Sequence, residues 1–357
     1  MFVQVHQILP SISYGDAISN HALEIRAILK SWGYKSEIYA QHIHPKLVHV
    51  TKSYTEYEKL SSSENILIFH FSIGSDVSRF VKTLPDKKIL IYHNITPYNY
   101  FLGINDTLVH LLRTGRKELS EYAGITDLAL GDSEYNRKEL EGIGFKNTGV
   151  LPIIVDFEKY NQEPDKKILN KFEDDHTNFI FVGRLSPNKK QEDVIKVFYY
   201  YNKCIDQNSR LFLVGSYTGT EKYYAKLQKL VKRLNLEQNI YIPGHVDFKE
   251  LLAYYKLSDV FISMSEHEGF CVPLLESMHL GLPIIAYSSS AIPYTLNGSG
   301  ILIGEKRYED IAELAHILVK NGKIRDKIVE KQMLQLKQFE KPKIEAMLKK
   351  YIEEVIN

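Results

Sequence analysis

The sequence predicts an α/β protein with two domains. Its 357 residues exceed what one hydrophobic core usually supports. Short apolar runs typical of buried strands alternate with helical patterns in both halves of the chain. Between about Lys159 and Thr177 this alternation gives way to a polar, charged stretch, which we interpret as the linker between the domains.

The first half opens with a strand, a glycine-bearing loop and a helix. Phe2 to Leu9 mixes apolar and polar residues like a strand, and the loop after it holds Gly15. The next helix shows one apolar face at helical spacing and ends at Gly33 (Ile18, Ala22, Ile25, Leu29, Trp32). Such an opening is typical of a Rossmann-like unit. No G-x-G-x-x-G occurs, which argues against a dinucleotide oxidoreductase.

The remaining strands are expected at regular intervals along the chain. In the first half they are Ser36–Ala40, Asn65–Phe71, Lys88–Tyr92, Leu128–Gly131 and Val150–Val155. In the second half they are Asn178–Val182, Arg210–Val214, Ile240–Pro243, Asp259–Met264 and Pro283–Tyr287. Two histidines, His70 and His93, stand at strand ends, where a parallel sheet carries its ligand-contacting loops. A lone histidine is more often a satisfied polar residue.

Composition limits the possible partners and the cellular compartment. The net charge of +1 gives no reason to expect nucleic acid as a partner. Cys204 and Cys271 are far apart in sequence, which suits a reducing compartment and gives no metal-binding spacing. No apolar run approaches the ~20 residues that span a bilayer. We therefore expect a cytoplasmic protein, with the inner face of the membrane as the alternative location.

Residues 265–278 form the most informative stretch. The apolar run Asp259–Met264 is followed by a loop with Gly269 and then by Pro273, which suits the first turn of a helix. The N-terminus of a helix favours phosphate groups and sugar hydroxyls. Glu268 and Glu276 are separated by seven residues, and a carboxylate suits the vicinal diol of a ribose or sugar. The alternative is an ordinary strand–loop–helix turn with two solvated glutamates.

This stretch resembles glycosyltransferase family 4, a family of retaining GT-B glycosyltransferases. The run EGFCVPLLESMHLGLPII is similar to the pattern of that family, E-G-F-G-x-P-x-x-E-A-M-A-x-G-x-P-V-V. Cys271 replaces the common glycine and Ser277 the usual alanine. A second motif of the family, G-R-x-x-x-x-K, falls on Gly183, Arg184 and Lys189.

The resemblance implies the fold and its division. A GT-B protein has two Rossmann-like α/β/α domains that face each other across a cleft, and its last helix crosses back to the first domain. We expect an acceptor-binding domain over residues 1–160, a donor-binding domain over 161–338 and the crossing helix over 339–357. That last segment carries an apolar stripe at helical spacing (Ile344, Met347, Leu348, Tyr351, Ile352, Val355). A membrane-surface helix is the alternative for it.

The resemblance also implies the roles of site residues in the second half. Arg184 and Lys189 would bind the donor diphosphate, with Lys190 able to replace Lys189, and both cations would stabilise the leaving group without metal. Glu268 would bind the hydroxyls of the donor sugar, and Glu276 the ribose. The other residues implied at this donor site are Gly183, Gly269, Phe270, Cys271 and Val272, which offer backbone, and Val246, which flanks the nucleobase.

In the first half the implied contacts are fewer. Gly15 would face the donor diphosphate or the acceptor, and Asp16 an acceptor hydroxyl, although a plain tight turn is the alternative. His93 would reach the donor sugar.

The expected function is retaining transfer of a hexose, with mannose among the candidates, from a UDP- or GDP-sugar to a hydroxyl. The acceptor would be a sugar or lipid-linked sugar of polysaccharide or lipid-linked oligosaccharide biosynthesis, with peripheral membrane association as one possibility. No cofactor or metal is expected, because no D-x-D occurs. The alternatives are another GT-B enzyme, such as a sugar-nucleotide epimerase or a disaccharide synthase, and a sugar-nucleotide-binding module without turnover.

Overall fold

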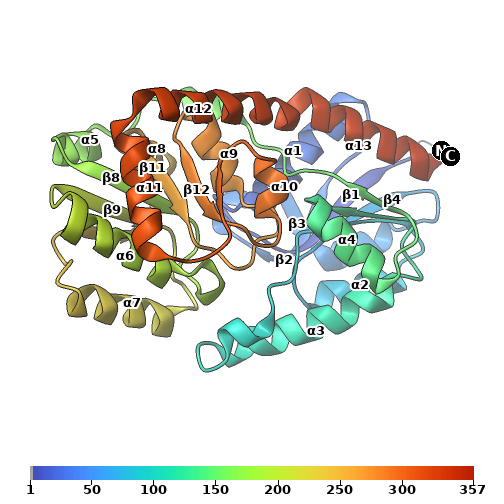
Figure 1. Ribbon diagram of the computed structural model, residues 1–357. Helices are drawn as coiled ribbons and strands as arrows, with labels where there is room; N and C mark the ends of the chain where they lie inside the picture. Colours follow the sequence, from blue (N-terminus) through green and yellow to red (C-terminus); the bar gives the residue numbers. More distant parts are fainter. Residues whose placement is uncertain (1–2) are drawn as a thin grey trace. The chain divides into compact units, whose positions relative to one another are not determined.

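Two all-parallel sheets organise the chain in the computed structural model, which describes residues 3–357 (Figure 1). The first has seven strands and the second six. The described residues divide into two compact units. Of the described residues, unit 1 contains 3–99, 107–155 and 339–357, and unit 2 contains 100–106 and 156–338. Within residues 3–357, no helix is both long enough and apolar enough to cross a bilayer.

Unit 1 is built on the strand order β3-β2-β1-β4-β5-β6-β7. Its strands are β1 Val5–Ile12, β2 Ile38–Ile43, β3 Thr51–Ser53, β4 Ile66–Phe71, β5 Lys87–Tyr92, β6 Leu128–Gly131 and β7 Thr148–Val150. Its helices are α1 Ala17–Ser31, α2 Asp76–Thr83, α3 Asp106–Tyr122, α4 Glu134–Ile143 and α13 Lys341–Ile356. The first strand was expected over Phe2–Leu9, but β1 runs three residues further, and Phe2 lies outside the described residues.

Unit 2 repeats the architecture with the strand order β10-β9-β8-β11-β12-β13. Its strands are β8 Thr177–Val182, β9 Ser209–Val214, β10 Ile240–Gly244, β11 Val260–Ser263, β12 Ile284–Tyr287 and β13 Ile301–Ile303. Its helices are α5 Lys166–Phe172, α6 Gln191–Tyr200, α7 Glu221–Arg233, α8 Phe248–Lys256, α9 Val272–His279, α10 Ile292–Leu296, α11 Tyr308–Lys320 and α12 Gly322–Leu336.

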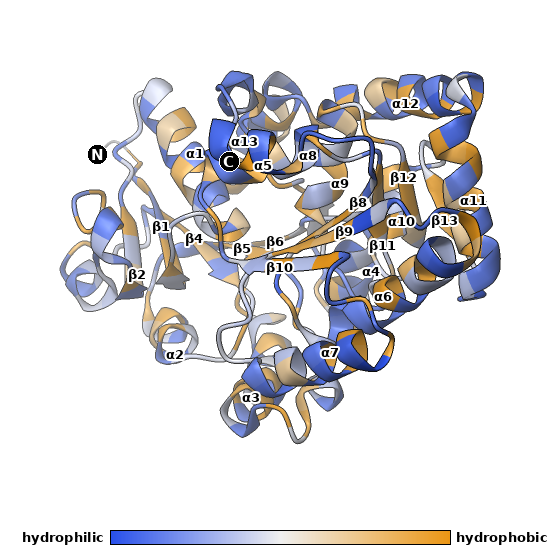
Figure 2. Cartoon of the chain, turned by 90° about the vertical axis from the view of Figure 1, so that its left-hand side faces the viewer, coloured by the Kyte–Doolittle hydropathy of each residue, from blue (hydrophilic) through white to orange (hydrophobic). Residues whose placement is uncertain are grey.

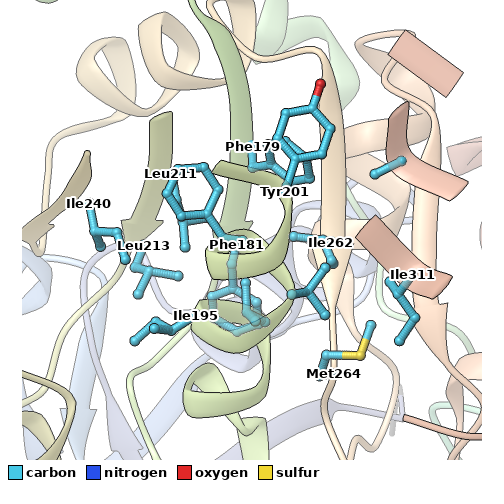
Figure 3. Packing of buried hydrophobic residues seen from close by; sticks show 14 of the residues in the cluster. Phe179, Phe181, Ile195, Tyr201, Leu211, Leu213, Ile240, Ile262, Met264 and Ile311 are labelled. Carbon is cyan, nitrogen blue, oxygen red and sulfur yellow. The ribbon is translucent and has the colours of Figure 1, made fainter. Parts of the chain in front are cut away.

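The core of unit 2 lies between its sheet and the helices that cover it. Alternate residues of β8, β9 and β11 point to one face, where side chains of α6 and α11 meet them (Figure 3). Phe179 and Phe181 on β8 are at most 2% exposed. Helix α7 is amphipathic, with Tyr223, Leu227 and Val231 buried at spacings of four, and it alternates between blue and orange in Figure 2. Ile104, in the short segment 100–106, also joins this core.

Helix α13 packs on the core of unit 1, as the fold prediction required. Four residues of its apolar stripe are buried there (Ile344, Leu348, Ile352, Val355). Tyr351 is half-buried, and its hydroxyl accepts a hydrogen bond from the backbone N–H of Val150 at 3.2 Å. Met347, predicted to share the stripe, is 40% exposed. The buried face of α13 is therefore narrower than the sequence pattern indicated.

The polar stretch expected to be a linker contains structure instead. Helix α5 lies within it, and Phe172 at the end of α5 is 3% exposed. Its ring packs edge-to-face on Phe212 and Tyr241. The division between the units lies between Val155 and Asp156. The sequence analysis expected it a few residues later, after residue 160.

Candidate active site

The reversal of strand order in unit 2 brings two predicted motifs together. Strands β8 and β11 are distant in sequence but pair directly, with Val260 aligned to Phe179. The G-R-x-x-x-x-K motif follows β8, and the E-x7-E motif follows β11. Both loops leave the carboxyl ends of neighbouring parallel strands at a switch point, where open α/β sheets bind ligands.

Asn188 joins these two loops. The side-chain amide of Asn188 donates to the backbone carbonyl of His267 at 3.1 Å. The backbone carbonyl of Asn188 accepts from the backbone N–H of Glu266 at 2.9 Å. Asn188 is 4% exposed, so water competes little for these bonds. The junction holds Lys189 and Glu268 at a fixed spacing.

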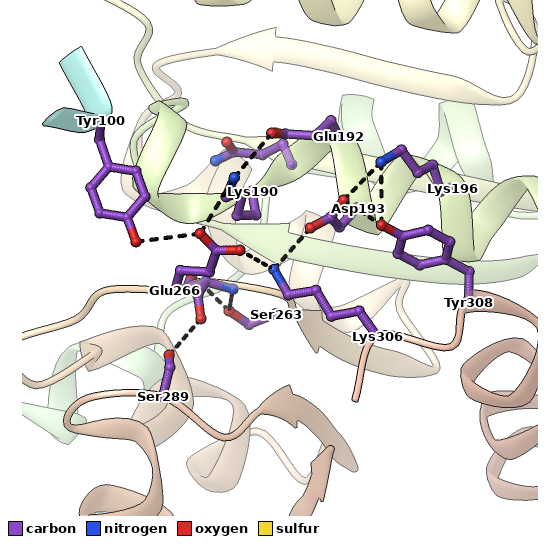
Figure 4. Close-up of polar contacts among 12 residues, drawn as sticks. Tyr100, Lys190, Glu192, Asp193, Lys196, Ser263, Glu266, Ser289, Lys306 and Tyr308 are labelled. Carbon is purple, nitrogen blue, oxygen red and sulfur yellow. Dashed lines mark hydrogen bonds and ion pairs between the residues drawn. The ribbon is translucent and has the colours of Figure 1, made fainter. Parts of the chain in front are cut away.

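The two lysines of the motif take different partners. Lys189 donates to Glu268, whose side chain is 6% exposed. Lys190 instead lies 3.3 Å from Glu266 and 3.8 Å from Glu192 (Figure 4). The structure thus separates two neighbours that the sequence could not distinguish. Lys189 accompanies the glutamate expected to bind the donor sugar.

Lys306 forms ion pairs that hold the loop after β11. Its ammonium lies 2.8 Å from a carboxylate oxygen of Glu266 and 2.8 Å from one of Asp193, in the first turn of α6 (Figure 4). Burial alone would lower the pKa of Lys306, but its two carboxylate partners raise it above the ordinary value. Lys306 therefore stays charged and holds the side chain of Glu266, two residues before Glu268.

Glu276 is held by two tyrosines. The hydroxyl of Tyr160 donates to one carboxylate oxygen at 2.6 Å, and that of Tyr255 to the other at 2.7 Å. Burial raises the pKa of Glu276, and the two hydrogen bonds offset only part of this. Each carboxylate oxygen can accept a second bond, so a diol can still be bound.

The chain enters α9 through an unusual backbone conformation. Cys271, the N-cap, has φ 73° and ψ 67°, the left-handed region that favours glycine. Pro273 lies in the first turn of α9, as predicted. Burial also raises the pKa of the Cys271 thiol well above its ordinary value. The cysteine thus fills a glycine position as a neutral thiol.

We expect Cys271→Val to destabilise the protein by ~1–3 kcal/mol, because a β-branched residue is strained at positive φ. Cys271→Gly should be close to neutral, since the strain it relieves offsets the ~0.4–1 kcal/mol of unfolded-chain entropy that glycine adds. Thermal unfolding of the two variants measures the difference. Equal stability of both would contradict this interpretation of the loop.

The other predicted donor residues occupy neighbouring loops of unit 2. Arg184 is exposed, and its guanidinium donates to the carbonyl of Thr218 at 2.8 Å. A Cβ at Gly215 would lie 2.0 Å from the carbonyl oxygen of Gly183, so these two strand-end loops approach as only glycine allows. Val246 is half-buried after β10, one residue before the N-cap of α8. Gly269 and Val272 are half-buried, and Phe270 is 4% exposed.

In unit 1, the first loop is a helix start. Gly15 has φ 79°, and Asp16 is the N-cap of α1. The Asp16 carboxylate accepts from the backbone N–H of Ser19 at 2.9 Å and from its hydroxyl at 2.8 Å. Both predicted residues are exposed, but Asp16 already has a structural role.

His93 lies just after β5, with its ring enclosed. Its Nδ1 lies 2.8 Å from Asp132 Oδ2 and its Nε2 lies 2.9 Å from His70 Nδ1. The side chain is 1% exposed, whereas the whole residue is 8% exposed. The exposed surface of His93 therefore belongs mostly to its main chain. Contact between its ring and a sugar stays a prediction, and it requires one of these two hydrogen bonds to break.

Several contributing residues carried no sequence signal. Asn188 falls on an unspecified position of its motif, and Tyr160 lies in the stretch interpreted as a linker. Tyr255 lies in a stretch whose pattern indicates only an amphipathic helix. Among residues 3–357, no group of three or more His, Cys, Asp or Glu is arranged to hold a metal ion. The expected independence from metal stays a prediction.

Comparison with known proteins finds a family match within unit 2. Residues 161–334 match the family described as glycosyl transferases group 1. An uncharacterised glycosyltransferase of Methanocaldococcus jannaschii is 32% identical over 190 residues, covering 51% of this chain and 46% of the relative. The O-antigen chain mannosyltransferase B of Escherichia coli is 26% identical over 165 residues, covering 45% and 41%. The chain thus spans less than half the length of either relative.

Solved structures share the fold at low identity. The Anabaena protein Alr3699/HepE in complex with UDP-glucose aligns with a TM-score of 0.78 at 15% identity, covering 98% of this chain and 99% of that one. Sucrose-phosphate synthase from Thermosynechococcus elongatus gives 0.76 at 13% identity, covering 99% of both. The fold is that of GT-B proteins, as the sequence predicted.

Proposed function

We propose that this protein, a member of the glycosyl transferases group 1 family through residues 161–334, transfers a hexose from a nucleotide-sugar to a hydroxyl acceptor with retention of configuration. The observation that carries the proposal is the pairing of Lys189 with Glu268, held in place by the bonds of Asn188 between two strand-end loops. A cation for the diphosphate and an acceptor for sugar hydroxyls then lie side by side near the N-terminus of α9.

The chemistry of transfer fits these groups. Breaking the bond between sugar and phosphate leaves negative charge on the diphosphate, which Arg184, Lys189 and the start of α9 would stabilise. Glu268 would orient the sugar, and Glu276 would bind the ribose through the diol. We propose Gly183, Gly269, Phe270, Cys271 and Val272 as the surrounding backbone and Val246 beside the base. Gly15 stays a proposed contact of the donor diphosphate or the acceptor, and Asp16 a proposed contact of an acceptor hydroxyl.

The donor and acceptor are proposed as classes. A uridine diphosphate sugar is supported by the UDP-glucose bound to Alr3699/HepE, and mannose as the sugar by the name of the mannosyltransferase relative. A guanosine diphosphate sugar stays the other proposed donor. A polysaccharide or lipid-linked oligosaccharide acceptor follows from the O-antigen chain named for that relative.

A panel of UDP- and GDP-sugars, with and without candidate acceptors, tests this proposal. Release of nucleoside diphosphate that depends on acceptor, together with an α-linked product from an α-linked donor, supports retaining transfer. An altered sugar still attached to its nucleotide would indicate an epimerase. A stabilised protein without any turnover would indicate a binding module. Sucrose-phosphate synthase shares the fold, so sugar phosphates belong in the acceptor panel.

Activity is expected to survive an excess of EDTA, because the proposed stabilisation of the diphosphate comes from Arg184, Lys189 and α9. Initial rates measured before and after chelation test this directly. A complete loss that magnesium or manganese restores would contradict the proposal.

His93→Ala is expected to lower turnover strongly while leaving the affinity for free nucleotide unchanged, because the residues proposed to bind the ribose, the base and the charge of the diphosphate lie in unit 2. Isothermal titration with the nucleoside diphosphate and initial rates measure the two effects. His49→Ala, which alters an exposed histidine of the same unit, is the matched control. Preserved turnover with a lower unfolding temperature would make His93 a structural residue.

A further inference from the structure

A chain of buried side chains crosses four neighbouring strands of unit 1. Gln7 on β1 bonds His70 at the end of β4, His70 bonds His93 after β5, and His93 bonds Asp132 after β6. The three contacts measure 2.9, 2.9 and 2.8 Å, and the planes of the two imidazole rings are parallel to within 4°. Each residue except His93 is at most 1% exposed, and the His93 side chain is also 1% exposed.

The direction of the first hydrogen bond is fixed by the Gln7 amide. Its Nε2 donates to the carbonyl of Ala22 at 3.0 Å, so its Oε1 faces His70 Nε2. A carbonyl oxygen only accepts, and His70 Nε2 must therefore carry a proton. Burial lowers the pKa of His70 well below its ordinary value, which keeps that ring neutral. A neutral His70 has an unprotonated Nδ1.

The second and third hydrogen bonds follow from the first. Because His70 Nδ1 is an acceptor, His93 Nε2 must donate to it. The third contact, between His93 Nδ1 and Asp132 Oδ2, then needs a further proton. Without it a lone pair would face a carboxylate at 2.8 Å. Three hydrogen bonds need three protons, and two neutral imidazoles supply two.

We propose that Gln7, His70 and Asp132 are positioning residues which lock the ring of His93 and hold a third proton between His93 and Asp132. Whether that proton resides on the imidazole or on the carboxylate, the pair has no net charge. The inference rests on the proposed function only in naming His93 as the residue that is positioned.

The surroundings favour a neutral pair. Among residues 3–357, Asp132 Oδ1 has no hydrogen-bond partner, so a bare carboxylate here would be poorly solvated. His21 of α1 is a titratable group that also faces the chain, with its ring at 88° to both imidazoles. Its Nδ1 accepts from the backbone N–H of Ile154 at 3.0 Å, and burial keeps the pKa of His21 well below its ordinary value. No charge on His21 replaces the third proton.

The third proton links folding to pH with a definite sign. In the unfolded chain a histidine loses its proton near pH 6.5 and an aspartate near 3.9. Where the folded state alone holds the proton, the unfolding constant rises tenfold per pH unit from this source.

Proton release on unfolding tests the proposal without donor or acceptor. The full chain is unfolded in weakly buffered guanidinium chloride at pH 7.5 with an indicator dye. Asp132→Asn supplies an N–H donor to His93 Nδ1, and Gln7→Leu removes the acceptor that fixes the direction. Either change lets two protons satisfy the remaining bonds. We expect the wild type to release about one proton more than each variant.

The matched control is Asp86→Asn. Asp86 is also a buried carboxylate of unit 1, but it accepts from the hydroxyls of Tyr57 and Ser61, which carry their own protons. We expect this variant to release as many protons as the wild type. Equal release from the wild type, Asp132→Asn and Gln7→Leu would overturn the proposal.

Nitrogen-15 spectra of the folded wild type at pH 7.5 provide a second measurement that needs neither of these variants to fold. With signals assigned through His70→Asn and His93→Asn, we expect protons on Nε2 of both rings. An unprotonated Nε2 on His93 would overturn the proposal. Because no sugar nucleotide is present, failure of the transfer assays would leave either result unchanged.

Discussion

Alanine at Arg184 or at Lys189 is expected to lower kcat/KM for the donor by roughly ten- to hundredfold. A charge-assisted hydrogen bond contributes ~1.5–3 kcal/mol, and the charge that these groups would meet grows as the diphosphate leaves. Arg184 is exposed at the end of β8, and Lys189 is joined to Glu268 by the loop that Asn188 holds. The two cations therefore approach the proposed diphosphate from fixed loops.

Initial rates at low donor concentration measure these losses, and thermal unfolding must accompany them. Lys189→Ala leaves Glu268 without its cation partner, so part of its effect is on stability. Lys190→Ala tests which of the two neighbouring lysines binds the diphosphate. Because Lys190 pairs with Glu266 and Glu192, we expect a smaller loss of kcat/KM from this variant than from Lys189→Ala. Lys229→Ala, on the exposed face of α7, is the surface control. Full activity in the double variant Arg184→Ala, Lys189→Ala would contradict the assignment.

The sequence predicted the parts of this site that are local. Glu268, Pro273 and Glu276 lie within one strand–loop–helix passage, whose pattern is read from neighbouring residues. Most expected strands occur where apolar runs indicated them, because strands buried in a parallel sheet are apolar throughout. The short edge strands β3 and β13 were missed, since runs of three residues carry no pattern. The strand expected over Val150–Val155 is β7 Thr148–Val150 instead.

The parts that depend on tertiary pairing could not be predicted. Lys189 meets Glu268 across 79 residues because β8 and β11 are neighbours, and Tyr160 meets Glu276 across 116. A polar composition predicted a linker around Tyr160, yet aromatic packing and one hydroxyl placed it in unit 2. The ring of His93 shows the same limit: its strand-end position was readable, but its enclosure by His70 and Asp132 was not.

Replacing Glu276 is expected to weaken the binding of free nucleoside diphosphate by roughly ten- to hundredfold, because its carboxylate would accept two hydrogen bonds from the ribose. Glu268→Ala should leave that affinity nearly intact and depress turnover, since Glu268 is assigned to the sugar. Isothermal titration with the nucleoside diphosphate separates the two. Equal losses of affinity would contradict the division. Glu276→Gln is the better variant, because alanine leaves two buried tyrosine hydroxyls unpaired.

The affinity for nucleotide should also depend on pH through Glu276. Burial raises the pKa of this carboxyl above its ordinary value, so it becomes protonated on acidification before an exposed glutamate does. A protonated carboxyl accepts less strongly, and nucleotide affinity should fall as pH is lowered. Tyr160→Phe removes one hydrogen bond that favours the ionised form, so the fall should begin at higher pH than in the wild type. Titrations across the acid range measure the pH at which affinity falls in the wild type and in Tyr160→Phe. An identical pH dependence in the two proteins would contradict the proposal that Glu276 binds the ribose.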